Sequence, residues 1–152
     1  MIKPTIHLAA DHRGYCLKYE IKKYLQKKGY NIIDHGNYRY EANDDYPIFG
    51  QKVCQAVQKN PKKLFGILLC GSGAGMNILA NKFSKLRAAI CWNKNVAFDA
   101  RNDDNPQILI LPADYISKKE AKLTVNKFIN TPFSGKQKNI RRLKQISKIK
   151  SC

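Results

Sequence analysis

The sequence contains no apolar run that approaches the length of a membrane span. Its first residues, Met-Ile-Lys-Pro, include no apolar region of the kind found in a secretion signal. The chain also lacks internal repeats, low-complexity blocks and linker-like stretches. These absences exclude a membrane protein and a multidomain array, so we expect one cytoplasmic domain spanning residues 1–152.

Cysteine and histidine occur in no metal-binding arrangement. The five cysteines are scattered without a Cys-x-x-Cys pair, and they show no zinc-ligand spacing with the three histidines. We therefore expect no metal site. Four of the cysteines, Cys152 among them, are expected to be small buried residues or surface thiols, and only Cys70 has a context that suggests chemistry.

Acidic residues are scarce, since 11 Asp and Glu face 28 Lys and Arg and give a net charge of +17. Such a charge can indicate a nucleic-acid partner. The lysines, however, are spread over nearly every polar helical face, and only the segment after Lys136 is concentrated and basic. No nucleic-acid-binding motif accompanies them, so a nucleic-acid-associated protein is the least favoured function.

The most informative stretch is the apolar run Leu64–Cys70 followed by three alternating glycines. This order predicts a buried strand, a tight loop and a helix. Glycines at every second position bring backbone N–H groups close to a ligand, and such a loop suits a phosphate or an oxyanion that forms during reaction. The positive electrostatic potential of these N–H groups and of the helix start is expected to lower the pKa of Cys70 and to favour its thiolate.

Apolar runs alternate with amphipathic segments along the whole chain. This pattern predicts an α/β fold: a Rossmann-like three-layer sandwich with a five-stranded parallel sheet. If the strand order is 2-1-3-4-5, the loops after the first and third strands meet at one crevice. The expected strands are Thr5–Ala10, Tyr30–Asp34, Leu64–Cys70, Arg87–Cys91 and Gln107–Leu111.

The helices have recognisable ends. Gly29 is expected to end the first helix, and Pro47 fits the first turn of the second. A short helix is expected over Asn95–Arg101, and the pattern Ser117-Lys-Lys-Glu120 predicts a capping box. The last segment, Asn139–Ile149, is predicted to form a basic amphipathic helix that docks on another subunit.

Several short motifs resemble, in order and spacing, the ribose-5-phosphate isomerase B family, which includes galactose-6-phosphate and allose-6-phosphate isomerases. The resemblance runs from about Ile6 to Arg141 and implies a metal- and cofactor-free aldose–ketose isomerase that acts on a phosphorylated pentose. It also implies a homodimer or tetramer whose active sites are completed across the interface. The motifs are Ala10-Asp11-His12-Arg13-Gly14, Asp45-Tyr46-Pro47, Cys70-Gly71-Ser72-Gly73-Ala74-Gly75 and Ala80-Asn81-Lys82.

Matching positions imply the roles of individual residues. Cys70 would be the base that moves a proton between C1 and C2, and the Ser72 hydroxyl would help to hold the cis-enediolate. Asp11 and His12 would contact the substrate, and Arg141 would bind its phosphate. Further substrate contacts are expected from the amides of Gly71, Gly73, Ala74 and Gly75 and from Asp45 and Tyr46, although Asp45 can equally be a helix cap.

The sequence departs from the family pattern at three places. Asp103 stands where the family carries the histidine that opens the furanose ring, Asp114 replaces a phosphate-binding arginine, and Gln137-Lys138 replaces another. We expect that Asp103 or Asp104 partly substitutes, or that the enzyme works better from the ketose side. A weakened sugar-phosphate-binding relative and an isomerase of another phosphorylated aldose remain as alternatives.

Overall fold

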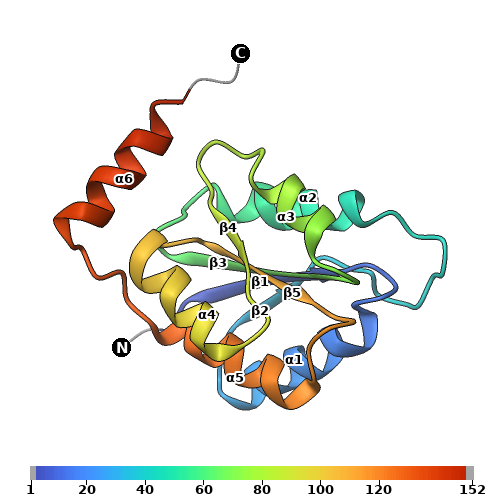
Figure 1. The fold of residues 1–152 in the computed structure, drawn as a ribbon. Coiled ribbons are helices and arrows are strands. Elements are labelled where there is room, and N and C mark those ends of the chain that lie inside the picture. Colours follow the sequence, from blue (N-terminus) through green and yellow to red (C-terminus); the bar gives the residue numbers. More distant parts are fainter. Residues whose placement is uncertain (1–2, 150–152) are drawn as a thin grey trace.

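The computed structural model describes residues 3–149, and its strands and helices form three layers (Figure 1). The strands are β1 Thr5–Ala10, β2 Ile32–Asp34, β3 Leu64–Cys70, β4 Ala88–Ile90 and β5 Ile108–Pro112. The helices are α1 Tyr15–Lys27, α2 Tyr46–Val57, α3 Ala74–Ala80, α4 Lys94–Asp99, α5 Lys118–Asn130 and α6 Gln137–Ser147. All strand pairs are parallel, as expected.

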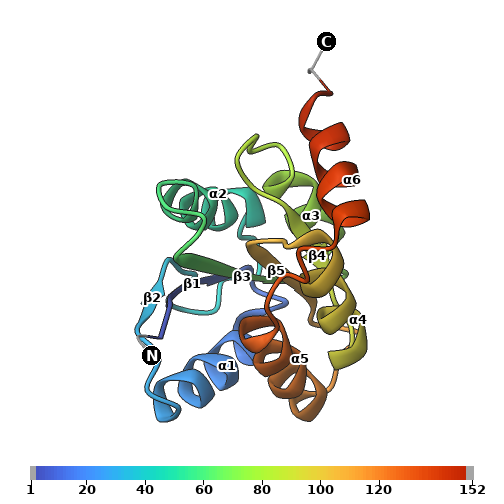
Figure 2. The same cartoon turned by 90° about the vertical axis from the view of Figure 1, so that its left-hand side faces the viewer.

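The sheet lies between two helical layers, and Figure 2 shows α2 and α3 on one face with α1, α4 and α5 on the other. Helix α6 belongs to neither layer and projects from the body. The predicted Rossmann-like three-layer sandwich is therefore confirmed.

The expected strand order was wrong at one end of the sheet. The order is β2-β1-β3-β5-β4, so β5 lies between β3 and β4. All five residues of β5 are buried, whereas the three residues of β4 are half-buried. A strand that is apolar on both faces is stabilised most at the centre of the sheet, and the short β4 fits the edge. The reversal of strand order between β1 and β3 is as expected.

Two apolar cores follow from the alternation of side chains along the central strands. Ile67 and Leu69 of β3 pack toward α1 and α5, whereas Leu68 and Cys70 pack toward α2 and α3. The alternation therefore places the Cys70 side chain on the α2–α3 face. Cys54, Cys70 and Cys91 are buried and Cys16 is exposed, as expected, while Cys152 lies outside the described residues.

Two predictions about helix ends needed correction. Helix α4 begins at Lys94 and continues into a π-helical turn over Ala100–Asp104. At the start of α5, the Ser117 hydroxyl accepts a hydrogen bond from the Glu120 N–H, but the Glu120 carboxylate accepts one from the Lys94 N–H. Only half of the capping box forms, because Glu120 links α5 to α4 instead.

Within residues 3–149, no helix is long and apolar enough to cross a membrane. In the same part of the chain, no three His, Cys, Asp or Glu side chains are grouped to hold a metal ion.

A stacked pair of histidines links β1 to the end of β2 and predicts a loss of stability in acid. His7 Nδ1 lies 2.8 Å from His35 Nε2, and burial together with His35 and Lys59 lowers the pKa of His7 to about 4. The unfolded chain takes up this proton near the ordinary pKa of 6.5, before the folded chain does. The free energy of unfolding should therefore fall by up to about 3 kcal/mol between pH 6.5 and 4.

Urea unfolding of the wild type and a His7→Asn variant measures this contribution. The variant should show a flatter decline in stability across the same pH range. Parallel pH profiles of the two proteins would contradict the prediction.

Candidate active site

The ends of three neighbouring strands are held together by backbone hydrogen bonds. The Ala113 N–H donates to the Cys70 carbonyl at 2.9 Å, and the Asp114 N–H donates to the Gly71 carbonyl at 3.0 Å. On the other side of β3, the Asp11 N–H donates to the Leu69 carbonyl at 3.3 Å. The loops after β1, β3 and β5 therefore converge around Cys70, at the point where the strand order reverses.

Cys70 is 5% exposed and ends β3 directly before the glycine loop. Burial raises the pKa of the Cys70 thiol above its ordinary 9.0, and the nearby Asp11 and Asp114 carboxylates add to that effect. The N–H groups of Met76 and Gly73 act in the opposite direction but do not reverse it. The expectation of a lowered pKa for Cys70 was therefore wrong, because the desolvation of the thiol outweighs the hydrogen bonds from the N–H groups of the loop.

The glycine loop Gly71–Gly75 bends sharply after β3. Gly73 directly precedes α3 and has a φ of 82°, a backbone conformation that residues with side chains rarely adopt. A β-carbon on Gly71 would lie 2.5 Å from Arg13 Nε and 2.7 Å from Asp114 Oδ2. The Ser72 hydroxyl is exposed and accepts a hydrogen bond from the Ala74 N–H at 3.3 Å, so its own proton is free to be donated to a ligand.

Asp11 and His12 lie beside this loop but differ in their partners. Asp11 is 6% exposed, and its Oδ1 accepts a hydrogen bond from the Gly14 N–H at 3.0 Å. Burial raises the pKa of Asp11. His12 Nδ1 donates to Asp44 Oδ1 at 2.7 Å, because an ionised carboxylate can only accept. That bond leaves Nε2 of His12 for a ligand.

Asp44, which was not among the predicted residues, holds His12 in place. Its Oδ1 also accepts from the His12 N–H at 3.0 Å, and its Oδ2 accepts from Asn37 Nδ2 at 3.0 Å. These hydrogen bonds hold the pKa of Asp44 below its usual range. Its place directly before the Asp45-Tyr46-Pro47 motif was the signal that could have identified it.

Asp45 and Tyr46 stand where α2 begins. Asp45 is exposed, and its side chain makes no capping hydrogen bond, so the alternative role as a side-chain cap is not supported. The Tyr46 ring lies against Gly75, since a β-carbon there would be 2.5 Å from Tyr46 Cζ. Tyr46 therefore borders the glycine loop.

The remaining expected site residues, Asp103, Asp104 and Arg141, lie elsewhere. Asp103 and Asp104 end the π-helical turn shortly before β5, whereas Cys70 pairs with Pro112 at the other end of that strand. The two ends of β5 are four residues apart, which corresponds to a distance of roughly 13 Å along the strand. Asp103 Oδ1 accepts hydrogen bonds from Asn102 and from Asn139, and the Asp104 carbonyl accepts from Arg87.

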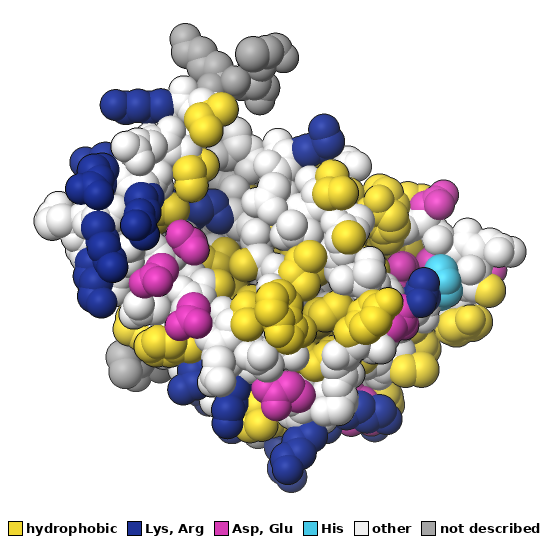
Figure 3. All heavy atoms as spheres, in the orientation of Figure 1, with side chains coloured by type: hydrophobic (Ala, Val, Ile, Leu, Met, Phe, Trp, Pro, Cys, Tyr) yellow, Lys and Arg dark blue, Asp and Glu magenta, His cyan; other side chains and the backbone are white. Residues whose placement is uncertain are grey.

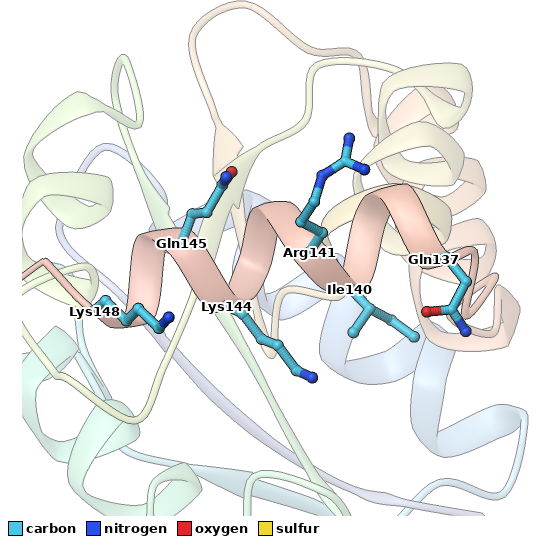
Figure 4. A pocket seen from close by; sticks show the side chains of 6 residues that line it. All are labelled: Gln137, Ile140, Arg141, Lys144, Gln145 and Lys148. Atoms are coloured by element: carbon cyan, nitrogen blue, oxygen red, sulfur yellow. The ribbon is translucent and has the colours of Figure 1, made fainter.

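Arg141 is exposed on α6, along one face of the helix that forms a shallow hollow of about 330 Å³ (Figure 4). In Figure 1 the strands point to the right, whereas α6 leaves the body on the left. The predicted residues thus form two groups at opposite ends of the parallel strands. The hollow is lined by Gln137, Ile140, Arg141, Lys144, Gln145 and Lys148.

The fold and this site define an α/β protein with a buried thiol beside an oxyanion-type loop at the switch point of a parallel sheet. A family model described as Ribose/Galactose Isomerase matches residues 6–146, and the chain belongs to this family. The chain is 37% identical over 131 residues to the probable ribose-5-phosphate isomerase B of Mycoplasma genitalium, covering 86% of each chain. It is 38% identical over 138 residues to the ribose-5-phosphate isomerase B of Mycobacterium tuberculosis, covering 91% of this chain and 85% of the relative.

Solved structures give the same result. The Mycoplasma genitalium ribose-5-phosphate isomerase B with bound ribulose 5-phosphate has a TM-score of 0.91 and 36% identity, covering 94% of this chain and 93% of that one. The Thermotoga maritima ribose 5-phosphate isomerase has a TM-score of 0.90 and 40% identity, covering 96% and 99%. The resemblance inferred from the motifs is therefore confirmed.

Proposed function

We propose that this protein interconverts ribose 5-phosphate and ribulose 5-phosphate through a cis-enediolate. The observation that carries the proposal is Cys70 at the mouth of the glycine loop, in a chain that resembles a relative with bound ribulose 5-phosphate over 94% of its length. Relatives of similar length carry the name ribose-5-phosphate isomerase B. Proton transfer beside a carbonyl needs a base and donors aimed at the oxygen that becomes charged, and the Cys70 thiol and the N–H groups of the loop are the groups proposed for these two roles.

In the proposed reaction the Cys70 thiolate removes the proton from C2 of the open-chain aldose. The electron pair of that bond forms the C1–C2 double bond, and the carbonyl electrons move onto O1. The N–H groups of the loop and the Ser72 hydroxyl stabilise this oxygen. The proton on the Cys70 thiol exchanges with solvent while the enediolate is bound. The thiol then delivers a proton to C1 and the O2 proton moves to O1, so the thiolate is restored and the ketose leaves.

We further propose that the site is completed by a second copy of the chain. Asp103 and Cys70 stand at opposite ends of the parallel strands, so within one chain they cannot act on the same sugar carbons. Helix α6 offers an apolar surface for such a partner. Leu143, Ile146 and Ile149 line a hollow of about 760 Å³ together with Phe83 and Leu86.

Charge supports the same arrangement. Figure 3 shows Lys and Arg side chains gathered at the left edge, over α6. The carboxylates of Asp11 and Asp114 lie near Cys70, and the Asp44 carboxylate lies near Asp11. A basic helix from one copy would therefore bring positive charge to the acidic residues around Cys70 of the other copy and would favour an anionic substrate.

Replacing Asp103 by alanine should separate ring opening from proton transfer. If Asp103 opens the furanose ring, turnover of ribose 5-phosphate should fall by about 10²–10⁴. Exchange of the C1 hydrogens of ribulose 5-phosphate with solvent needs no ring opening and should continue near the wild-type rate. Proton NMR in deuterated water measures both quantities.

Asp99→Ala is the matched control, because Asp99 is an exposed carboxylate on the preceding helix. Unchanged turnover of ribose 5-phosphate by the Asp103→Ala variant would rule out the ring-opening role.

The function itself is tested by incubating the purified protein with ribose 5-phosphate or ribulose 5-phosphate and following both sugars. We expect interconversion in both directions and none with unphosphorylated ribose. Faster turnover of galactose 6-phosphate or allose 6-phosphate would replace the pentose by another phosphorylated aldose. Binding of the pentose phosphates without turnover by the folded protein would favour the weakened binding relative instead.

A further inference from the structure

Arg13 and Asp114 form an ion pair directly over the glycine loop. The Arg13 guanidinium comes from the loop after β1, and the Asp114 carboxylate comes from the segment after β5. Both side chains crowd the same backbone position, since a β-carbon on Gly71 would meet Arg13 Nε and Asp114 Oδ2. The pair therefore stands next to the residue that follows Cys70.

This pair changes the interpretation of Asp114. Taken alone, an aspartate at this place adds negative charge to a site that already has Asp11 and Asp44 nearby. A sugar phosphate carries about two negative charges near neutral pH and would be repelled by these carboxylates. The Arg13 guanidinium offsets the charge of Asp114 and places a permanent cation beside Gly71.

The geometry leaves more than half of the Arg13 side chain accessible. The Arg13 side chain is 57% exposed, against 30% for Asp114, and its Nη2 is the atom in contact with the carboxylate. A guanidinium carries five N–H donors in a fixed plane, so an ion pair through one nitrogen leaves donors for a second anion. Asp114 thereby fixes a side chain that would otherwise sample many rotamers.

We propose that Arg13, held in place by Asp114, is the residue of this chain that binds the phosphate of the substrate. The inference rests on the proposed function, since it assigns a role within the same site. A planar guanidinium binds a phosphate through two parallel hydrogen bonds, which a lysine cannot reproduce. Arg13 therefore sets the preference for phosphorylated over plain sugars.

Replacing Arg13 by glutamine tests the proposal. The KM for ribose 5-phosphate and the inhibition constant of inorganic phosphate should both rise by about ten- to hundredfold, because a charge-assisted hydrogen bond contributes about that factor to binding. The kcat should change little. Arg13→Lys should recover only part of the affinity. Lys119→Gln removes one positive charge from the exposed surface of α5 and should behave as the wild type.

A charge swap tests the pairing itself. R13D puts two carboxylates over Gly71 and should raise KM more than R13Q does. The double variant R13D/D114R restores one guanidinium and one carboxylate at the same place and should return KM toward the wild-type value. An R13D/D114R variant as impaired as R13D would overturn the positioning role of Asp114.

A readout that needs no turnover separates this inference from the proposed function. Inorganic phosphate should slow the alkylation of Cys70 by iodoacetamide, followed on its peptide by mass spectrometry, in the wild type but far less in R13Q. Equal protection in both proteins would overturn the role of Arg13. An active wild type with the same KM in R13Q and Lys119→Gln would overturn it too, and the isomerase assignment would stand.

Discussion

The Cys70→Ala variant should lose isomerase activity by a factor of about 10²–10⁴ in kcat, because a positioned base contributes about that much to proton transfer. Cys70 is the thiol at the meeting point of the three strand ends, and its neighbours Gly71 and Gly73 supply loop N–H groups. The loop and the other binding residues remain in this variant. The loss should therefore appear in kcat much more than in KM.

Cys16→Ala is the matched control, because Cys16 is an exposed thiol on α1. Circular dichroism would verify that both variants are folded. A folded Cys70→Ala variant with wild-type turnover would show that another group removes the proton.

The activity should also rise steeply with pH. Burial and the carboxylates of Asp11 and Asp114 raise the pKa of Cys70 above 9.0, so little thiolate exists in the free protein at pH 7. Since kcat/KM follows the base form of the free enzyme, it should increase about tenfold per pH unit from pH 7 to 9. Initial rates with ribulose 5-phosphate measure this increase of kcat/KM with pH, and they do so without a ring-opening step.

Asp114→Asn provides the matching variant for this pH profile. Removing one of the carboxylates that raise the pKa of Cys70 should shift the rise of kcat/KM to lower pH. A wild-type profile that is flat between pH 7 and 9 would contradict the prediction, because it would mean that the thiolate is already formed at neutral pH.

Local patterns predicted most elements of the fold. The run Leu64–Cys70 is a strand over those residues, and Gly29, with a φ of 76°, follows the end of α1 as a terminating glycine. Such patterns depend on near neighbours in the sequence, so the structures that they predict are retained when the chain packs into its tertiary fold. The strand order could not be obtained in this way, because it depends on which strand needs burial on both faces.

The candidate site was predicted in part. Cys70 and Tyr46 border the glycine loop, and His12 lies on the loop after the neighbouring strand β1, as expected; their roles stay predictions. The contacts of Asp44 with His12 and of Arg13 with Asp114 join residues 32 and about 100 positions apart, so no local pattern reveals them. The raised pKa of the thiol likewise depends on burial, which is a property of the packed structure.

The most direct test of the account is solvent exchange at C1 of ribulose 5-phosphate in deuterated water, followed by proton NMR with the wild type and with Cys70→Ala. If Cys70 exchanges a proton between the sugar and the solvent through an enediolate, the wild type should incorporate deuterium at C1, and the variant should do so about 10²–10⁴ times more slowly. Equal exchange rates in the two folded proteins would contradict the central claim that Cys70 is the base.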